Sequence, residues 1–490
     1  MKNNHFNEYR KILIYIFLCF LFVISIQQFA LYKGNIAHLV HAIKEFNNNK
    51  LQNDWIANQS NHLPLFTYFN FILIKLFSNK IIYIVHGILL GSCALFIFLI
   101  CKEIIPKLQD IFYSLIWFAL FIFIYHENSF FTGVAGQYVI DEGYQPASFG
   151  VLFFIGYYFF LKNKNFLCVF FICLSASFHP TYILHSGFFI MGILVYFLIK
   201  KKYSLILNIS FYYIFLIAPI TIFIILNFLN IDQGSKLLGQ EILLNRIPHH
   251  ANIHQWLSYK DGIFLGVYFL MLFLTRKNLK FFIPLMVFGF CSIFLSLIQF
   301  FINSPSLALA FPWRTSVFIS PISSMICLSF LINKIAKDNK LFKSLSLFFF
   351  VTLFCLFFYK SHFIKNLNAK FQNDLLLVKK IKNKYDIIDV ILIPVRLDFI
   401  RMNLGIPIFI DWKHHAFKYN EVISWKSRVD LASEFYNAKS LDEQKKALKK
   451  IQKIEKISHI LIDKKQLRDR CKNLIDDEKY FLVASNDCLN

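Results

Sequence analysis

The chain has 490 residues, of which 57% are hydrophobic and only 17% are charged, and its mean hydropathy is +0.52. This composition excludes an ordinary soluble globular protein. The formal net charge is +23, but the tail from Lys360 onward holds 17 of the 29 acidic residues beside 26 of the 52 basic ones. The rest of the excess lies mostly in short loops between apolar segments. The positive-inside rule and anionic lipid headgroups account for it, so we expect no nucleic-acid partner.

Apolar segments long enough to cross a bilayer fill residues 11–359. A hydrocarbon core needs about 20 apolar residues per helix. The first segment has basic flanks, but no small-residue cleavage pattern follows it; Gln27 and Gln28 come instead. We therefore interpret it as a retained helix and not a signal peptide. The sequence predicts a polytopic α-helical membrane protein.

Short basic loops fix the predicted orientation. Lys162–Lys164, Lys200–Lys202, Arg276–Lys280 and Lys334–Lys343 should lie in the cytoplasm, together with the N-terminus. These anchors predict about eleven transmembrane helices and a C-terminal part outside. The helices are expected near residues 11–31, 81–101, 111–126, 147–161, 166–178, 181–199, 204–229, 262–275, 281–302, 314–333 and 342–359.

The apolar segment Leu65–Phe77 tests this scheme. If it crossed the membrane, the first loop and the later polar loops would lie on opposite faces. We interpret it as an interfacial helix whose apolar side faces the headgroups. The first external loop then runs from about residue 33 to 80 and contains an interfacial helix.

The composition changes after residue 360, which predicts a transmembrane domain over 1–360 and an extracytoplasmic domain over 361–490. A helical stalk (361–386) leads to alternating strands and helices, the pattern of a small α/β domain. Strands are expected at Val390–Pro394, Ile406–Ile410, Ile457–Ile462 and Tyr480–Ala484, and helices at Glu421–Tyr436, Asp442–Lys456 and shortly after residue 462. The first of these helices should bury Ile423, Val429, Leu431 and Phe435.

Asp54 follows the first span in a loop with few other acids. A carboxylate near the membrane surface can deprotonate an acceptor hydroxyl or hold a divalent metal cation. It can equally cap the helix that follows. Asp141 and Glu142 form an adjacent acid pair in the second external loop, where they could share a cation with Asp54 or simply be solvated.

Cationic and imidazole groups gather in the later external loops. Arg246, His249 and His250 suit a phosphate or pyrophosphate, because a guanidinium fork matches phosphate oxygens. His179 lies at a turn that Pro180 explains, and its ring could face a cavity. Arg314, after Pro312-Trp313, is either a phosphate ligand or an interfacial anchor. Because these loops share one side, we hypothesise that they converge.

The layout resembles the GT-C class of polytopic membrane glycosyltransferases. The resemblance rests on a first span, a long external loop with an acid just after it, acids in the second external loop and a soluble external C-terminal domain. It implies a polyprenyl-phosphate sugar donor, with Asp54 and Asp141 or Glu142 as acid, base or metal ligand. Arg246, His249, His250, Arg314 and His179 would then bind the donor or its phosphate.

The short motifs depart from that class. The first loop has no D-x-D or E-x-D, and W-W-D-x-G is absent. The set N-D-W, Q-P, H-P-T, R-x-P-H-H and P-W-R resembles bacterial membrane families of unassigned function at the edge of the class. In the tail, Phe399–Arg401, Asp411–Lys413 and Trp425–Arg428 belong to the same pattern.

The expected setting is the inner membrane of a bacterium, with lipid, a polyprenyl-linked sugar donor and a glycan, lipid or protein acceptor as partners. A polysaccharide polymerase or ligase would share this topology and depend more on its arginines. A transporter predicts internal repeats and charges at mid-membrane, and the sequence contains almost no such charge. A non-enzymatic scaffold predicts external acids that tolerate neutral substitution.

Overall fold

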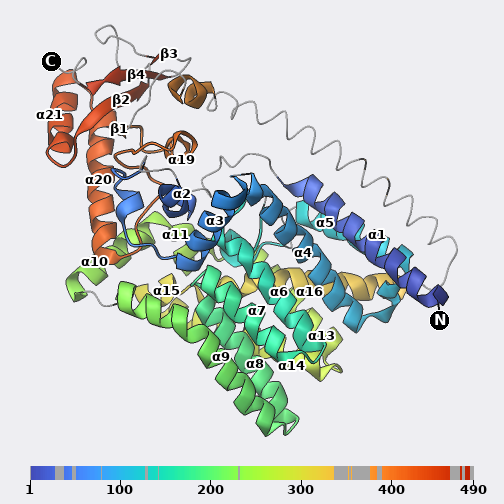
Figure 1. Ribbon diagram of the computed structural model, residues 1–490. Helices are drawn as coiled ribbons and strands as arrows, with labels where there is room; N and C mark the ends of the chain where they lie inside the picture. The colour runs from blue at the N-terminus through green and yellow to red at the C-terminus, as the bar shows by residue number, and fades with distance from the viewer. Residues whose placement is uncertain are drawn as a thin grey trace. The chain divides into compact units, whose positions relative to one another are not determined.

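The structure is a computed structural model, mostly helical (Figure 1). It describes residues 2–27, 38–46, 51–78, 80–126, 131–141, 143–229, 232–335, 351, 355, 376–382, 389–463, 475–476 and 480–485. The chain forms two compact units, which we describe separately. Unit 1 comprises Met1–Phe29, Tyr83–Phe223 and Leu244–Ile364, and unit 2 comprises Ala30–Ile82, Ile224–Leu243 and Lys365–Asn490.

Unit 1 is a bundle of apolar helices, and ten of the eleven helices expected from the sequence are present in it. They are α1 (Lys2–Ile26), α4 (Ile81–Ile104), α5 (Ile111–His126), α6 (Val151–Leu161), α7 (Asn165–Phe178), α8 (Tyr182–Ile199), α9 (Tyr203–Ile224), α13 (Tyr259–Thr275), α14 (Leu279–Ile302) and α16 (Ser316–Ile335). The eleventh, at 342–359, lies almost wholly outside the described residues.

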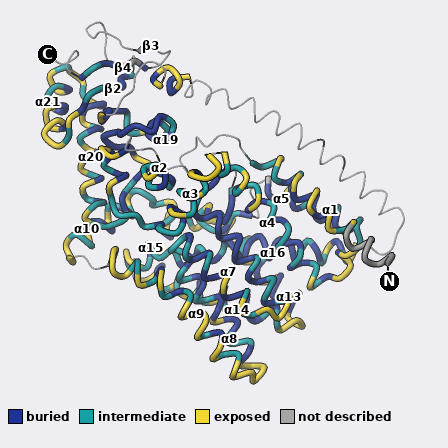
Figure 2. The backbone as a smooth tube through the Cα atoms, viewed as in Figure 1, coloured by how far each residue is buried: buried dark blue, intermediate teal, exposed yellow. Residues whose placement is uncertain are grey.

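Five helical segments in the described part of the chain are long and apolar enough to cross a membrane: Ile81–Ile104, Tyr182–Ile199, Tyr203–Phe228, Leu279–Ile302 and Pro305–Ile335. In the third of these, only 17% of the most apolar stretch is buried, and Figure 2 shows exposed residues along α9. Leu207, Phe211 and Phe215 are each about two-thirds exposed, as a surface that contacts lipid would be. The count of about eleven crossings stays a prediction.

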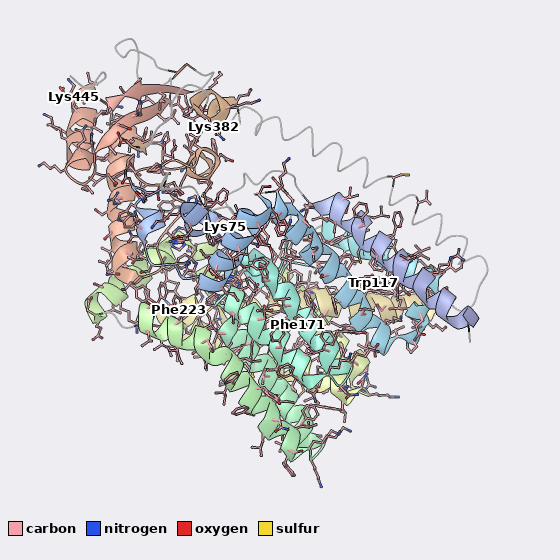
Figure 3. All side chains as sticks on the ribbon, in the orientation of Figure 1. Lys75, Trp117, Phe171, Phe223, Lys382 and Lys445 are labelled. Carbon is pink, nitrogen blue, oxygen red and sulfur yellow. The ribbon has the colours of Figure 1, made fainter. Side chains whose placement is uncertain are left out.

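Aromatic side chains fill much of the core of unit 1. Trp117 of α5, labelled in Figure 3, is fully buried and packs against Phe98, Phe118 and Phe121. Its Nε1 donates to Oγ of Ser329 at 3.0 Å, so the indole N–H has a partner inside the apolar bundle. The core of this unit therefore combines large apolar contacts with satisfied polar groups.

Two of the predicted basic loops meet at one end of the helices of unit 1. Nζ of Lys280 donates to the carbonyl of Leu161 at 2.6 Å and to Oδ1 of Asn163 at 2.7 Å. The turn before α14 therefore contacts the α6–α7 turn. Helix α7 begins beside Lys164 and ends beside His179. The basic turn and the H-P-T segment thus lie at opposite ends of the same helix.

Unit 2 contains a four-stranded sheet in the order β1-β2-β4-β3. Its strands are β1 (Val390–Leu392), β2 (Ile457–Asp463), β3 (Ile475–Asp476) and β4 (Tyr480–Ala484). Strand β2 pairs parallel with β1 and antiparallel with β4, which also pairs with β3. The connection from β1 to β2 contains α19 (Phe399–Leu404), α20 (Tyr419–Asn437) and α21 (Leu441–Gln452).

The strand expected at Ile406–Ile410 is not a regular strand. It forms only a parallel bridge to β1 at Ile408, with Ile391 donating to the carbonyl of Pro407 and accepting from the amide of Phe409. Proline has no N–H to offer a ladder, so pairing stops there. Most of the predicted stalk and the short helix after residue 462 lie outside the described residues.

The segment between α1 and α4 folds with the tail. Unit 2 also contains α2 (Val40–Phe46), α3 (Pro64–Phe77) and most of α10 (Gln233–Arg246). The Ser60 hydroxyl and amide both donate to the carboxylate of Glu421 on α20, at 2.5 and 3.2 Å. Helix α3, predicted to be interfacial, buries Phe66 and Ile74 and exposes Leu76. An exposed apolar side is compatible with a membrane-surface helix.

Candidate functional site

The carboxylate of Asp54 is buried in unit 2, with 0% exposure, and is engaged at both oxygens. Oδ1 accepts from the amide of Ala57 at 3.0 Å, a capping contact of the kind that the sequence left open. Oδ2 accepts from Nε of Arg401 at 2.7 Å and from the amide of Ile408 at 3.1 Å. In this geometry Asp54 anchors Arg401, and its carboxylate, at 0% exposure, is out of reach of a substrate hydroxyl.

Arg401 joins Asp54 to a second buried carboxylate. Its Nη1 donates to Oδ2 of Asp411, and both side chains are 0% exposed. A charge removed from water needs a partner, and a guanidinium between two carboxylates provides one on each side. Two carboxylates share one guanidinium here, so the cluster of Asp54, Arg401 and Asp411 is not electrically balanced by itself.

Asp411 in turn orients His414. Its Oδ1 accepts from the His414 amide at 2.7 Å and from ring Nδ1 at 2.8 Å. Burial acts to raise the pKa of Asp411, but His414 and Arg401 lower it to about 2, so the carboxylate is ionised. An ionised carboxylate only accepts, so Nδ1 carries a proton. Nε2 of His414 is buried and has no hydrogen-bond partner among the described residues.

His414 lines a cavity of about 50 Å³ in unit 2. The walls come from α2, from the loop before α3 and from the segment that follows Asp411. Its other polar lining residues are His38, His41, Gln59, Ser60, Asn61, His62, Lys413 and His415. Desolvation lowers the pKa of His41 to about 4, so this ring is uncharged at neutral pH.

In unit 1 the H-P-T and P-W-R segments meet. Nη1 of Arg314 donates to Oγ1 of Thr181 at 3.0 Å, and that hydroxyl lies 3.3 Å from the ring nitrogens of His179. His185 holds the two segments together, with ring nitrogens 2.8 Å from the carbonyl of Thr181 and 3.2 Å from that of Phe311. Nε of Arg314 is buried without a partner among the described residues.

Two further loops contact the P-W-R segment. Nε1 of Trp313 donates to the carbonyl of His250 at 3.1 Å, and Nδ1 of His250 lies 3.0 Å from the carbonyl of Ala135. The amide of Val134 donates to Oγ of Ser316 at 2.9 Å. The loop that contains Val134 and Ala135 and the R-x-P-H-H and P-W-R segments therefore converge within unit 1.

A mainly apolar cavity of about 190 Å³ lies among α13, α14 and α16. Rings on its wall come from Trp256, Phe264, Tyr268, Phe300 and Trp313. Nε1 of Trp256 is buried and has no partner in the described part of the chain. Trp313 and Ser316 both line this cavity and flank Arg314 in sequence. Arg314, whose Nε has no partner among the described residues, thus lies between two lining residues in the sequence.

The second-loop acids are only partly defined. Asp141 is half-buried, and its backbone carbonyl lies 2.9 Å from Nε2 of His86. Tyr125 donates to the carbonyl of Ile140 at 2.8 Å. The backbone before the acid pair is therefore held by two helices, α4 and α5. Glu142 lies outside the described residues.

Arg246 lies at the end of α10 and is half-buried. His249 is exposed, and its ring centre is 4.1 Å from that of His250. Contacts within unit 1 thus link His250 and His179 to the P-W-R segment, whereas Asp54 belongs to unit 2.

A divalent metal was predicted from the sequence at Asp54 and Asp141. No group of three or more His, Cys, Asp or Glu side chains is placed to hold a metal ion in the described ranges. Asp54 also gives both oxygens to Arg401 and two amides. Asp54 in this geometry does not fit a metal ligand, and no metal enters the chemistry that we propose.

The sequence did not predict the hydrogen-bonded series of side chains that runs from Asp54 through Arg401 and Asp411 to His414. It singled out the segments Phe399–Arg401 and Asp411–Lys413 but assigned them no role. An arginine and an aspartate within otherwise apolar tail segments were the available signal for buried partners. No pattern in the sequence pointed to His414.

The fold and these clusters describe a polytopic helical membrane protein with an arginine and histidine centre near an apolar cavity. No family model matches the chain, and no curated protein matches it. Among solved structures it is similar to ArnT from Cupriavidus metallidurans, which was crystallised with undecaprenyl phosphate. The identity is 9% and the TM-score 0.48, over 96% of this chain and 97% of that chain. At these values no residue role passes from ArnT to this chain.

Proposed function

We propose that the chain is a membrane glycosyltransferase of the GT-C kind. It would move a sugar from a polyprenyl-phosphate-linked donor to an acceptor at the extracytoplasmic face, in the assembly of a cell-surface glycan or glycoconjugate. The proposal places the basic turns of unit 1 in the cytoplasm, the H-P-T and P-W-R segments outside and the α/β fold after residue 361 outside. The observation that carries it is Arg314, a half-buried cation whose sequence neighbours Trp313 and Ser316 line the apolar cavity of unit 1.

An anionic lipid needs two kinds of surface, and unit 1 offers both. Its polyprenyl chain would occupy the apolar cavity, whose walls are mainly aromatic and aliphatic. Its phosphate would pair with Arg314, which gives one donor to Thr181 and leaves Nε without a partner among the described residues. Undecaprenyl phosphate, the ligand crystallised with ArnT, belongs to this chemical class.

The proposed reaction breaks the bond between the anomeric carbon and the phosphate oxygen, while the acceptor oxygen bonds to that carbon. Negative charge develops on the leaving phosphate, and a cation fixed in a desolvated site stabilises it. Arg314 would supply that charge, with His179 and His250 close to the same segment. Arg246 and His249 remain proposed ligands of the donor.

The acceptor hydroxyl must lose its proton in this reaction. We propose the acids of the second loop, Asp141 and Glu142, for this role, because the backbone at Asp141 is held by His86. Asp54 would then act by holding Arg401 in place and would not contact the substrate. Because the Asp54 carboxylate pairs with Arg401, Asp54 does not serve as the catalytic base. This favours the alternative function, a polysaccharide polymerase or ligase whose chemistry depends on arginine.

The test is binding of undecaprenyl phosphate to the full chain in lipid nanodiscs. Arg314→Gln should weaken binding by about 10-fold to 100-fold, because hydrogen bonds to a charged group contribute about 1.5–3 kcal/mol. Arg276→Gln is the matched control. Arg276 is exposed, and among the described residues its guanidinium donates to the carbonyl of Phe273 alone. Equal affinity of wild type and Arg314→Gln, at equal thermal stability, would overturn the proposal.

A second measurement addresses the reaction. Wild type, Arg314→Gln and Asp141→Asn are compared, at matched membrane expression, for restoring a surface glycan in a deletion host. Loss of the glycan with either variant supports a transferase that uses that residue. Restoration by Asp141→Asn alone favours the polymerase or ligase, and restoration by both excludes the proposed chemistry.

A further inference from the structure

The cavity around His414 in unit 2 has no part in the transfer proposed for unit 1, yet it has the construction of a binding site. His414 is only 4% exposed, and Nε2 has no hydrogen-bond partner among the described residues. A buried polar atom without a partner is costly, so in a folded protein it calls for a ligand or a water. The same residue lines a cavity of about 50 Å³.

A series of hydrogen bonds through three buried side chains fixes the orientation of the His414 ring. Asp411 accepts from Nδ1 at 2.8 Å, Arg401 donates to Asp411, and Asp54 accepts from Arg401 at 2.7 Å. All three supporting side chains are 0% exposed. The indole of Trp425 also donates to the carbonyl of Asp411 at 3.1 Å. Few rotations remain for the ring, so its unpartnered nitrogen is held in one place, as preorganised binding requires.

The charged groups around the cavity limit the kinds of ligand that it can bind. Behind His414 two carboxylates share one guanidinium, which disfavours an anion. Lys413 lines the cavity and disfavours a cation, and no group of three metal-ligating side chains is present in the described ranges. A hydroxyl suits Nε2 in either protonation state, because it can donate to a lone pair or accept from an N–H. The ligand is therefore expected to be neutral and rich in hydroxyl groups.

The rest of the lining fits such a ligand. Gln59, Ser60 and Asn61 bring amide and hydroxyl groups to the wall. The rings of His62 and Phe417, stacked with centres 3.3 Å apart, both line the cavity and give it a partly apolar side. Flat rings beside hydrogen-bonding groups suit the two faces of a sugar, and the small volume admits one edge of it.

We propose that this cavity is a carbohydrate-binding site in which Nε2 of His414 hydrogen-bonds a hydroxyl of a neutral sugar. The site is built from unit 2 alone and stands independently of the transfer proposed for unit 1.

The experiment uses the full chain in nanodiscs and saturation-transfer NMR with glucose, galactose, mannose and N-acetylglucosamine as probes. His414→Asn keeps a side-chain N–H for Asp411 and removes the atom at Nε2. We expect at least one sugar to bind saturably to wild type, and about 10-fold more weakly to His414→Asn, the effect of losing one hydrogen bond of about 1.4 kcal/mol. His254→Asn, at an exposed histidine of unit 1 that has no role in the proposed transfer, should bind as wild type does.

Two results would overturn the site. One is that no probe binds saturably, which leaves only water at Nε2. The other is that His414→Asn binds as tightly as wild type. If His414→Asn does not fold, Gln59→Ala replaces it, because Gln59 brings an amide to the wall of the same cavity. Undiminished binding by Gln59→Ala would then count against the site. Because sugar binding is read without a lipid donor, its failure is distinct from failure of the proposed transfer.

Discussion

At the scale of single residues, Asp54 should act through stability. Asp54→Asn removes one partner of a buried ion pair and puts an amide where Oδ2 accepts from Arg401 and Ile408. Breaking a buried pair costs about 3–5 kcal/mol, so the thermal unfolding midpoint of the full chain should fall by several degrees. Asp430→Asn, at an exposed Asp that pairs with Lys426 on α20, should change it little. Equal midpoints for the two variants would contradict the anchoring role.

The same residue shows what the sequence can and cannot predict. Asp54 stands out because acids are scarce in its loop, and the capping contact to Ala57 is local. Its partner Arg401 is 347 positions away, and no local pattern relates two residues so distant. His414 was missed because an unpartnered nitrogen is a property of the folded site, which composition and spacing do not encode.

At the scale of elements, the close contact of α8 with α14 depends on glycine. A Cβ on Gly192 would lie 2.7 Å from the carbonyl oxygen of Pro284, a backbone atom that cannot move aside. Gly192→Ala should therefore lower stability by about 1–3 kcal/mol, the usual cost of overpacking. Gly266→Ala on α13 is the control, because a Cβ there meets nothing within 4 Å. The thermal unfolding midpoint distinguishes them, and a Gly192→Ala variant as stable as Gly266→Ala would refute the close packing.

Elements were predicted with uneven success, for physical reasons. Nine of the ten helices of unit 1 lie within a few residues of their predicted ranges, because long apolar runs between polar turns determine both type and extent. The exception is α1, which was expected near 11–31 and spans Lys2–Ile26. On α20 the buried side includes Val429 and Phe435 as predicted, but Ile423 and Leu431 are only half-buried. Arg428 is buried instead, because its guanidinium lies 4.9 Å from the Trp55 ring centre and pairs with Glu455. Such partners come from distant segments.

At the scale of the whole molecule, the sequence placed a boundary near residue 360 from composition alone. The contacts form a unit in which residues 30–82 and 224–243 fold together with the tail. Composition shows where the sequence becomes polar. It does not show which polar segments pack into the same core. The Ser60–Glu421 hydrogen bonds link positions 361 apart, a separation that no reading of consecutive residues can reveal.

The orientation of the whole chain is the last prediction. Lys162, Lys200 and Lys280 mark turns at one end of the helices of unit 1, and the H-P-T segment lies at the other end. Because basic loops stay in the cytoplasm, we expect a C-terminal epitope tag to be digested by protease added to spheroplasts, and an N-terminal tag to be protected. Inside-out vesicles should give the reverse pattern. Protection of the C-terminal tag in spheroplasts would place the cavity of His414 in the cytoplasm, where an extracytoplasmic sugar could not reach it.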